Sequence, residues 1–380
     1  MKKMTIVCMI TLAVISLLLP LNYASAMSNT DMLDDILIQN GLTDDYTMRN
    51  LYDLSGNLYW LIEFDTTGYA IYHPEANKLS EFSTSARSPF LNYTEIFYGG
   101  PTFYFVKIGD NLTNVLTNEH FELNAIQAQS QSINSLDEIY SKFISAENLS
   151  TRASDTSYLV PNAYYFQKLN SFGQNTQGTC GQLAASILLS YYANYYNVNF
   201  VPTQYISPKS GTSTNYQSWQ SMPNLSDSLH QELIQITRDL NENLATTGSS
   251  IKRILSEYYY RHVLGGVSQS VLTSPFFTDT NMRNIINSNN PMIMFGKLTL
   301  PSGSKGNHAV VCYGYRIISN VTYYTVHMGY SGYTSVELAN LWSANLFGQI
   351  YSITYSGTHV HSGNFIVNGT PHCGCGAVTI

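Results

Sequence analysis

Residues 174–183 read Gln-Asn-Thr-Gln-Gly-Thr-Cys-Gly-Gln-Leu, a polar turn that runs directly into a helical pattern. Apolar residues recur after it at 3.6-residue spacing (Leu183, Ala184, Ile187, Leu188 and Tyr191). We therefore predict a helix from Cys180 to about Tyr196, with Cys180 at its first position. The unpaired amides and the positive end of the dipole at a helix start favour a thiolate over a thiol.

Three more residues are candidate partners of this thiol. Gln174 precedes Cys180 and, by turning back, would offer a side-chain amide that stabilises an oxyanion together with the Cys180 backbone N–H; Gln177 is the alternative donor if the turn is shorter. His308 begins a predicted strand that continues to Ile318, where a rigidly held imidazole can take the thiol proton and return it to a leaving amine. His327, on the next predicted strand, is the candidate that orients His308.

This order of motifs resembles the papain-like cysteine peptidases, and most closely the secreted bacterial streptopain type. The motifs are Gln before a Cys that begins a helix, then Gly306-Asn307-His308-Ala309-Val310 at a strand start. The resemblance implies an α+β fold, in which a helical lobe carries Cys180 and an antiparallel strand lobe carries His308, preceded by a small α+β propeptide domain. It also implies peptide-bond hydrolysis through a thioester. The family usually has Asn or Asp where this chain has His327.

The order of the predicted elements independently favours α+β. Helices are expected at 230–244 and 249–260, and strands follow at 291–298, 308–318 and 322–328. In the N-terminal third, a helix is expected at 31–41, strands at 58–64, 68–72 and 102–106, and a further short helix from the spacing of Leu136, Ile139, Tyr140 and Phe143.

Charge and targeting signals divide the chain further. Residues 1–26 have a basic start, an apolar run and a small-residue Ala24-Ser25-Ala26 site, which predicts a signal peptide and hence a secreted product without a membrane anchor. Residues 27–152 carry 17 acidic and 6 basic residues, whereas residues 153–380 carry 8 and 10. We interpret 27–152 as an acidic propeptide-like domain and linker that inhibits its own catalytic domain (153–370), with 371–380 as a tail.

The remaining candidates predict less chemistry. Cys312 lies among apolar residues and is expected in the core. His372-Cys373-Gly374-Cys375 offers two thiols and a His without a second cluster, and His359 and His361 would share a strand face; no metal and no other cofactor is expected. The catalytic domain has no basic run, so nucleic acid is not an expected partner. Besides a peptidase acting on polypeptides, two alternatives stay open: an acyl-transferring or amide-hydrolysing thiol enzyme, and a secreted binding protein with a degenerate peptidase fold.

Overall fold

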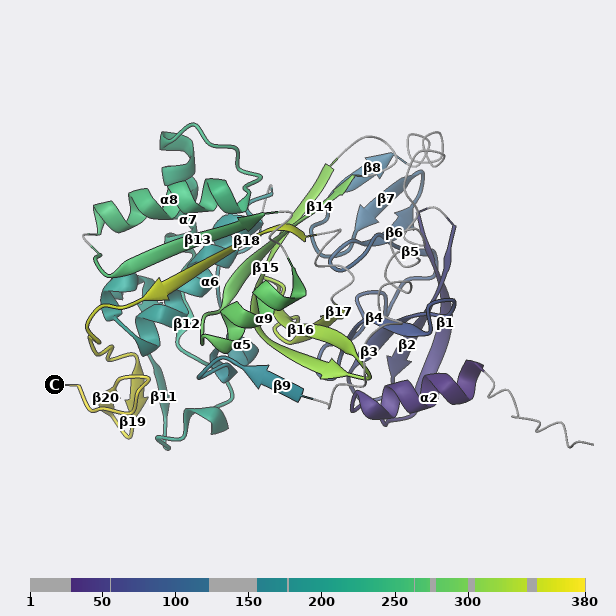
Figure 1. Ribbon diagram of the computed structural model, residues 1–380, viewed down its shortest axis with the longest axis horizontal. Coiled ribbons are helices and arrows are strands. Elements are labelled where there is room, and N and C mark those ends of the chain that lie inside the picture. The colour runs from purple at the N-terminus through teal and green to yellow at the C-terminus, as the bar shows by residue number, and fades with distance from the viewer. Residues whose placement is uncertain are drawn as a thin grey trace, which may run out of the picture.

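The computed structural model describes residues 29–54, 56–122, 156–175, 178–262, 264–273, 278–299, 305–339 and 347–379. Within these residues the chain contains helices and strands, and the strands dominate through one large sheet of 15 strands. The N-terminal unit (29–122) and the C-terminal unit (156–379) lie side by side, and every α-helix of the described residues except α2 belongs to the C-terminal unit (Figure 1). No helix among the described residues is long and apolar enough to cross a membrane.

The N-terminal unit is one helix followed by eight strands. Three of the predicted strands are observed as β2, β3 and β6, and the predicted helix at 31–41 is observed as α2; the helix expected around Leu136 lies outside the described residues. The elements are α2 (Asn29–Gln39), β1 (Tyr46–Asp53), β2 (Leu58–Phe64), β3 (Tyr69–His73), β4 (Lys78–Ser83), β5 (Ile96–Tyr98), β6 (Tyr104–Ile108), β7 (Asn111–Asn114) and β8 (His120–Glu122).

The C-terminal unit has most of its helices before its long strands, as predicted, but it begins with strand β9, and three short strands lie between α6 and α7. Its helices are α5 (Tyr164–Lys168), α6 (Cys180–Tyr195), α7 (Asp227–Asp239), α8 (Gly248–Arg261) and α9 (Asp279–Asn287), with 3-10 turns η1 (Val198–Phe200), η2 (Thr203–Tyr205) and η3 (Tyr216–Ser218). Its strands are β9 (Thr156–Leu159), β10 (Ile206–Ser207), β11 (Lys209–Gly211), β12 (Asn224–Leu225), β13 (Val267–Thr273), β14 (Met292–Thr299), β15 (Lys305–Ile318), β16 (Val321–His327), β17 (Val336–Ala339), β18 (Phe347–Tyr355), β19 (Phe365–Val367) and β20 (Thr370–His372).

One continuous sheet joins the two units, a feature that the charge division did not predict. The strand order is β13-β18-β14-β15-β16-β17-β4-β3-β2-β1-β5-β6-β7-β8, and β9 pairs with β15. The two units meet where β17 pairs antiparallel with β4, through Glu337 opposite Phe82 and Leu338 opposite Glu81. The Phe82 ring also packs edge-on against Tyr323, with centroids 5.4 Å apart. We call this β4–β17 pairing the seam.

Helix α6 is found where the spacing predicted it, and it is buried on all sides, which the periodic spacing of its apolar residues did not reveal. All of its residues are buried, including Gln182 and Asn194. Two of its polar side chains donate hydrogen bonds inside the protein: Gln182 Nε2 to Thr237 Oγ1 at 3.1 Å, and Asn194 Nδ2 to the Ser190 carbonyl at 2.8 Å, although Gln182 Oε1 accepts none. A polar residue can therefore occupy any face of such a helix, provided that its hydrogen bonds are made.

The pairing of strand β15 with its neighbour is irregular at Gly314. The register between β15 and β16 shifts between Cys312 and Gly314, and β9 pairs with β15 from Gly314 onward. A Cβ at Gly314 would lie 2.3 Å from Leu159 Cδ2 and 2.9 Å from the Tyr158 carbonyl oxygen, so only glycine allows this approach.

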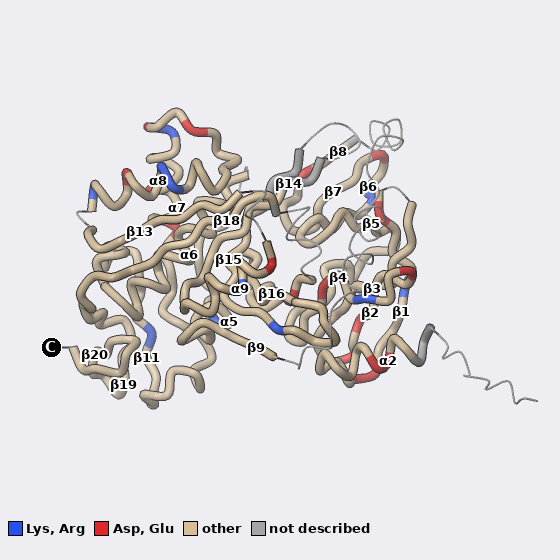
Figure 2. The backbone as a smooth tube through the Cα atoms, viewed as in Figure 1, with Lys and Arg blue, Asp and Glu red and all other residues tan. Residues whose placement is uncertain are grey.

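The acidic residues are concentrated in the N-terminal unit. Asp and Glu recur along α2 and the strands beside it, whereas most of the C-terminal unit's backbone carries neither charge (Figure 2). The charge asymmetry of the sequence therefore coincides with the division into an N-terminal and a C-terminal unit, although one sheet runs through both units.

Candidate functional site

Cys180 is the first residue of α6, as predicted. The preceding residue, Thr179, has φ −88° and ψ 23° and makes no side-chain capping bond, so the first amides of the helix stay available. The Cys180 side chain is 5% exposed. Backbone amides of Ala309, Gly181 and Cys180 itself hydrogen-bond its sulfur. The thiol of α6 thus lies against the residue that follows His308 on β15.

Burial decides the protonation state of this thiol. It raises the pKa of Cys180 to about 11, while the hydrogen bonds from the Ala309, Gly181 and Cys180 amides act in the opposite direction. The helix start alone predicted a lowered pKa, but the cost of placing a thiolate away from water is larger here. In this structure Cys180 is a thiol at neutral pH.

Alkylation of Cys180 by iodoacetamide, followed by peptide mass mapping, should therefore depend steeply on pH. At pH 8 a thiol of pKa 11 is ionised to about one part in a thousand, so the rate should rise about tenfold per pH unit between pH 7 and pH 10. Free glutathione added to a parallel sample serves as the reference for reagent quality. A rate that levels off below pH 8 would contradict the raised pKa.

His308 lies at the site as a buried, neutral imidazole. It is 4% exposed, and burial lowers its pKa to about 4, against the opposing effect of a hydrogen bond to the Met328 backbone. His308 Nε2 lies 3.0 Å from the Met328 carbonyl oxygen. Since a carbonyl only accepts, Nε2 carries the proton and Nδ1 keeps its lone pair. Nδ1 is therefore the nitrogen that can accept a proton.

His327 does not make the bond that the sequence predicted for it, and the orienting acceptor is a backbone group. His327 Nε2 lies 3.2 Å from the Leu169 carbonyl oxygen, and His327 Nδ1 accepts the Gly329 N–H at 3.0 Å, so both ring nitrogens are engaged away from His308. The bond to Gly329 fixes the backbone directly after Met328. His327 thus supports the turn that presents the Met328 carbonyl to His308. Sequence reasoning missed Met328 because any residue type can supply a carbonyl.

Tyr330 and Asn175 complete the surroundings of His308. The Tyr330 ring stacks on the imidazole, with centroids 5.7 Å apart and an interplanar angle of 11°. Asn175 Nδ2 donates to the Tyr330 hydroxyl at 2.8 Å. Asn175 lies in the turn quoted first, but its role needed the position of Tyr330, which is far away in sequence.

Gln174 lies at the rim of a cavity of about 590 Å³ beside this constellation. Its side chain is exposed, as a donor to an incoming substrate carbonyl must be. The walls come from three segments, 116–118, 170–175 and 329–331. The alternative donor Gln177 lies outside the described residues.

One wall of this cavity belongs to the N-terminal unit. The turn between β7 and β8 contributes Leu116, Thr117 and Asn118. The next residue, Glu119, contributes to raising the pKa of both Cys180 and Tyr330, after the larger effect of burial. We call residues 115–119 the covering turn, because they bring an acidic side chain and a wall to the edge of the thiol site.

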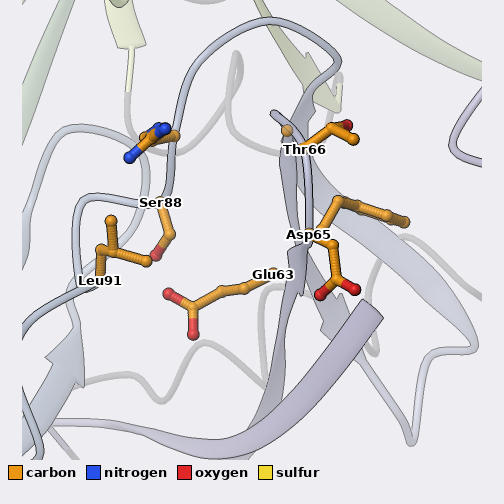
Figure 3. A pocket seen from close by; sticks show the side chains of 8 residues that line it. Glu63, Asp65, Thr66, Ser88 and Leu91 are labelled. Carbon is orange, nitrogen blue, oxygen red and sulfur yellow. The ribbon is translucent and has the colours of Figure 1, made fainter. Parts of the chain in front are cut away.

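Two other candidates lie apart from this chemistry. A cavity of about 100 Å³ in the N-terminal unit is lined by Glu63, Asp65, Thr66, Ser88 and neighbouring residues, and none of its lining residues is a Cys or His (Figure 3). Cys312 is fully buried in β15, where its thiol faces the Gly314 carbonyl at 3.4 Å, in keeping with the expected core position.

Comparison with known proteins gives weak similarities only. No protein-family model matches the chain, and no curated protein matches it. A solved structure from Bacillus anthracis described as a C39-like peptidase has a TM-score of 0.29 at 9% identity, over 53% of this chain and 100% of the other. A fragment of prointerpain A from Prevotella intermedia has a TM-score of 0.32 at 9% identity, over 82% of this chain and 100% of the other. Both TM-scores are low, so the function below rests on this chain's own residues.

Proposed function

We propose that this chain is an exported cysteine peptidase, made as a zymogen, with a papain-like arrangement of Cys180 and His308. One observation carries the proposal. The Cys180 sulfur lies against the Ala309 amide, and the adjacent His308 is neutral, with Nε2 donating to the Met328 carbonyl and Nδ1 keeping the lone pair that can accept a proton. Thiol, base and an orienting acceptor are the three parts of an activated nucleophile.

The proposed reaction proceeds in two halves. His308 Nδ1 takes the Cys180 proton, and the thiolate attacks the carbonyl carbon of a peptide bond. The Gln174 side-chain amide and the Cys180 backbone N–H stabilise the oxyanion of the tetrahedral intermediate. The imidazolium then protonates the leaving amine, so that the C–N bond breaks and a thioester forms. Water, deprotonated by His308, hydrolyses the thioester and regenerates the thiol.

The N-terminal unit is proposed to act as an intramolecular inhibitor. The covering turn narrows the cavity beside Gln174, and both burial and Glu119 raise the pKa of Cys180. Burial and Glu119 therefore both oppose formation of the thiolate, and the narrowed cavity restricts access of a substrate. Removal of residues 27–152 would hydrate the thiol and open the cavity, and both changes favour activity. Export follows from the predicted signal peptide at 1–26.

Loosening the covering turn alone should raise activity. Replacing Leu116, Thr117 and Asn118 together by glycine removes the side chains that line the cavity while leaving β7 and β8 in place. We expect the initial rate of peptide cleavage by the full chain to rise at least about tenfold, since a lowering of the Cys180 pKa by one unit increases the thiolate tenfold. The control is Leu91→Gly, at an exposed loop residue of the same unit. Equal rates for the turn variant and the control would argue against inhibition by this turn.

The proposal is tested with the full chain and its Cys180→Ala variant under reducing conditions. Mass spectrometry follows self-processing, a peptide library measures cleavage, and an epoxysuccinyl thiol-protease inhibitor reports the reactive sulfur. Loss of the N-terminal third by the parent alone, with one inhibitor adduct on Cys180, supports the peptidase. Transfer of acyl groups to amines without peptide cleavage would favour the acyl-transferring alternative. No cleavage and no adduct in a folded chain from which 27–152 has been cut would favour the binding protein.

A further inference from the structure

Four metal-ligating side chains converge at the C-terminal end of the chain, far from the thiol site in sequence. They come in two pairs, His359 with His361 and Cys373 with Cys375, and their ligand atoms all lie within 4.8 Å of one another. His359 Nε2 lies 3.0 Å from His361 Nδ1 and 3.5 Å from Cys373 Sγ. Cys375 Sγ lies 3.4 Å from His361 Nδ1. The sequence expectation of no metal rested on the two thiols having no second ligand pair, and this second pair is present.

We propose that these four residues bind one Zn²⁺ ion in a structural Cys₂His₂ site. With Zn–S near 2.3 Å and Zn–N near 2.0–2.1 Å, the edges of a tetrahedron of ligands are about 3.3–3.8 Å. The three ligand separations given above are close to these edges. Two thiolates and two imidazoles in a tetrahedral arrangement select zinc over the hard cations Mg²⁺ and Ca²⁺, which prefer oxygen.

The ligands are held by backbone contacts typical of a formed site rather than a chance meeting. The Cys373 N–H donates to the Ala377 carbonyl at 2.8 Å, and the Gly376 N–H donates to the Cys373 carbonyl at 2.8 Å, so the two cysteines lie on a tight turn. The Tyr216 hydroxyl also donates to the Cys373 carbonyl, at 3.1 Å. His372, which the sequence grouped with the cysteines, faces the Gly376 carbonyl through Nδ1 at 3.3 Å and stays outside the cluster.

The cluster lies against the C-terminal end of α6, the helix that begins at Cys180. The Gly374 N–H donates to the Asn194 carbonyl at 3.2 Å, and a Cβ at Gly374 would lie 2.5 Å from that same oxygen, so the approach needs glycine. On the histidine side, the Val198 N–H donates to the Val360 carbonyl at 3.0 Å, and the Val360 N–H donates to the Tyr196 carbonyl at 3.1 Å. The cysteine pair thus contacts the last turn of α6, and the histidine pair contacts the residues directly after it.

Four protein ligands leave no open coordination position, which is the mark of a structural rather than a catalytic zinc. Its role is to fasten the segment 359–375 to the end of α6. The site is independent of the proposed peptidase activity, since it shares no residue with the constellation of Cys180 and His308. Cys373 is buried, whereas the other three ligands are exposed, so an ion can enter from solvent.

The test uses the full chain without a polyhistidine tag, carrying Cys180→Ala so that it stays intact. It is purified under reducing conditions without chelator, and its metal content is measured by mass spectrometry of the elements. We expect one zinc per chain. The variants Cys375→Ser and His361→Asn change exposed ligands and should fold; each should lose zinc affinity by at least about tenfold. His262→Asn, at a histidine bonded to Glu232 and outside the cluster, is the control and should keep one zinc.

Two further readouts separate binding from misfolding. Exchange of zinc for Co²⁺ should give thiolate-to-cobalt charge-transfer bands and the intense visible bands of a tetrahedral site, and both should be absent in Cys375→Ser. Chelation should lower the melting temperature of the parent and leave that of Cys375→Ser unchanged. A folded parent without metal, a Cys373–Cys375 disulfide in its place, a different bound metal, or equal zinc in the parent and both ligand variants would each overturn the proposal.

Discussion

His308→Ala is expected to lower kcat/KM for peptide cleavage by the processed enzyme by at least about three orders of magnitude. The physical reason is the loss of the proposed proton acceptor, which precedes Ala309, the residue whose backbone amide contacts the Cys180 sulfur. His308 is neutral at working pH because burial lowers its pKa to about 4, and the Met328 carbonyl fixes its tautomer. Without it, the thiol must ionise against its own burial and the leaving amine has no proton donor.

A misfolded variant would give the same loss, so a second readout is needed. At high pH, hydroxide ionises Cys180 without help from a base. Iodoacetamide should therefore modify Cys180 in His308→Ala at pH 10 about as fast as in the parent, while peptide cleavage stays lost. His262→Ala, at a partly exposed histidine on the end of α8, is the matched control and should cleave like the parent. Cleavage by His308→Ala within tenfold of the parent would remove His308 from its role as base.

The second large effect is expected from two carboxyl groups at the seam, the fully buried Glu81 and the half-buried Glu337. Glu81 accepts hydrogen bonds from the hydroxyls of Tyr69 and Tyr104, at 2.9 and 2.6 Å, and from Tyr98 at 3.0 Å. Burial raises its pKa from 4.5 to about 7, against the effect of these bonds. Burial also raises the pKa of Glu337 to about 7, with Arg316 and Thr325 acting in the opposite direction. One carboxyl group thus lies on each strand of the seam.

The direction of the pH effect follows from these raised values. The folded chain binds the two protons more tightly than the unfolded chain does, so their stabilisation is complete below about pH 4.5 and is lost as the pH rises to about 7. A shift of about 2.5 pKa units corresponds to about 3 kcal/mol for each group. We expect the free energy of unfolding of the Cys180→Ala chain, measured in urea, to fall between pH 5 and pH 8 by a few kcal/mol.

Glu81→Gln should flatten this fall, because a neutral amide cannot ionise. The matched control is Glu95→Gln, which removes an exposed carboxylate beside Lys107 on the same unit and should keep the slope of the parent. If Glu81→Gln and the parent lose stability equally between pH 5 and pH 8, Glu81 is already ionised at the lower pH and the raised pKa is wrong.

The elements that the sequence predicted best are those with a long uninterrupted pattern. Helix α6 and strands β2 and β15 were placed within a few residues, since 3.6-residue or strand-like apolar patterns are local signals. The seam was not predicted, because pairing of β4 with β17 joins residues more than 250 positions apart. The burial of α6 on all sides also escaped prediction, since it depends on what packs against each face.

In the candidate site, too, some groups could be predicted from the sequence and others could not. Cys180, His308 and Gln174 carry side-chain chemistry that marks them in the sequence, whereas the Met328 carbonyl and the Ala309 amide carry none. His327 attracted attention because of its ring, yet the ring supports a turn. The proposed zinc ligands escaped prediction for another reason: each pair alone is a weak signal, and only folding brings His359 and His361 close to Cys373 and Cys375.

The seam has a further consequence if the N-terminal unit is removed, as the proposed zymogen requires. Strand β17 is then left with β16 on one side and with unpaired N–H and C=O groups on the other, which makes it an edge strand. An extended peptide from another chain can pair with such an edge through its backbone alone. The edge is short, four residues, and carries the acidic, half-buried Glu337, two features that limit stacking between copies. Under the proposed activation, the same cleavage that uncovers Cys180 would therefore also expose the edge of β17 to a new backbone partner.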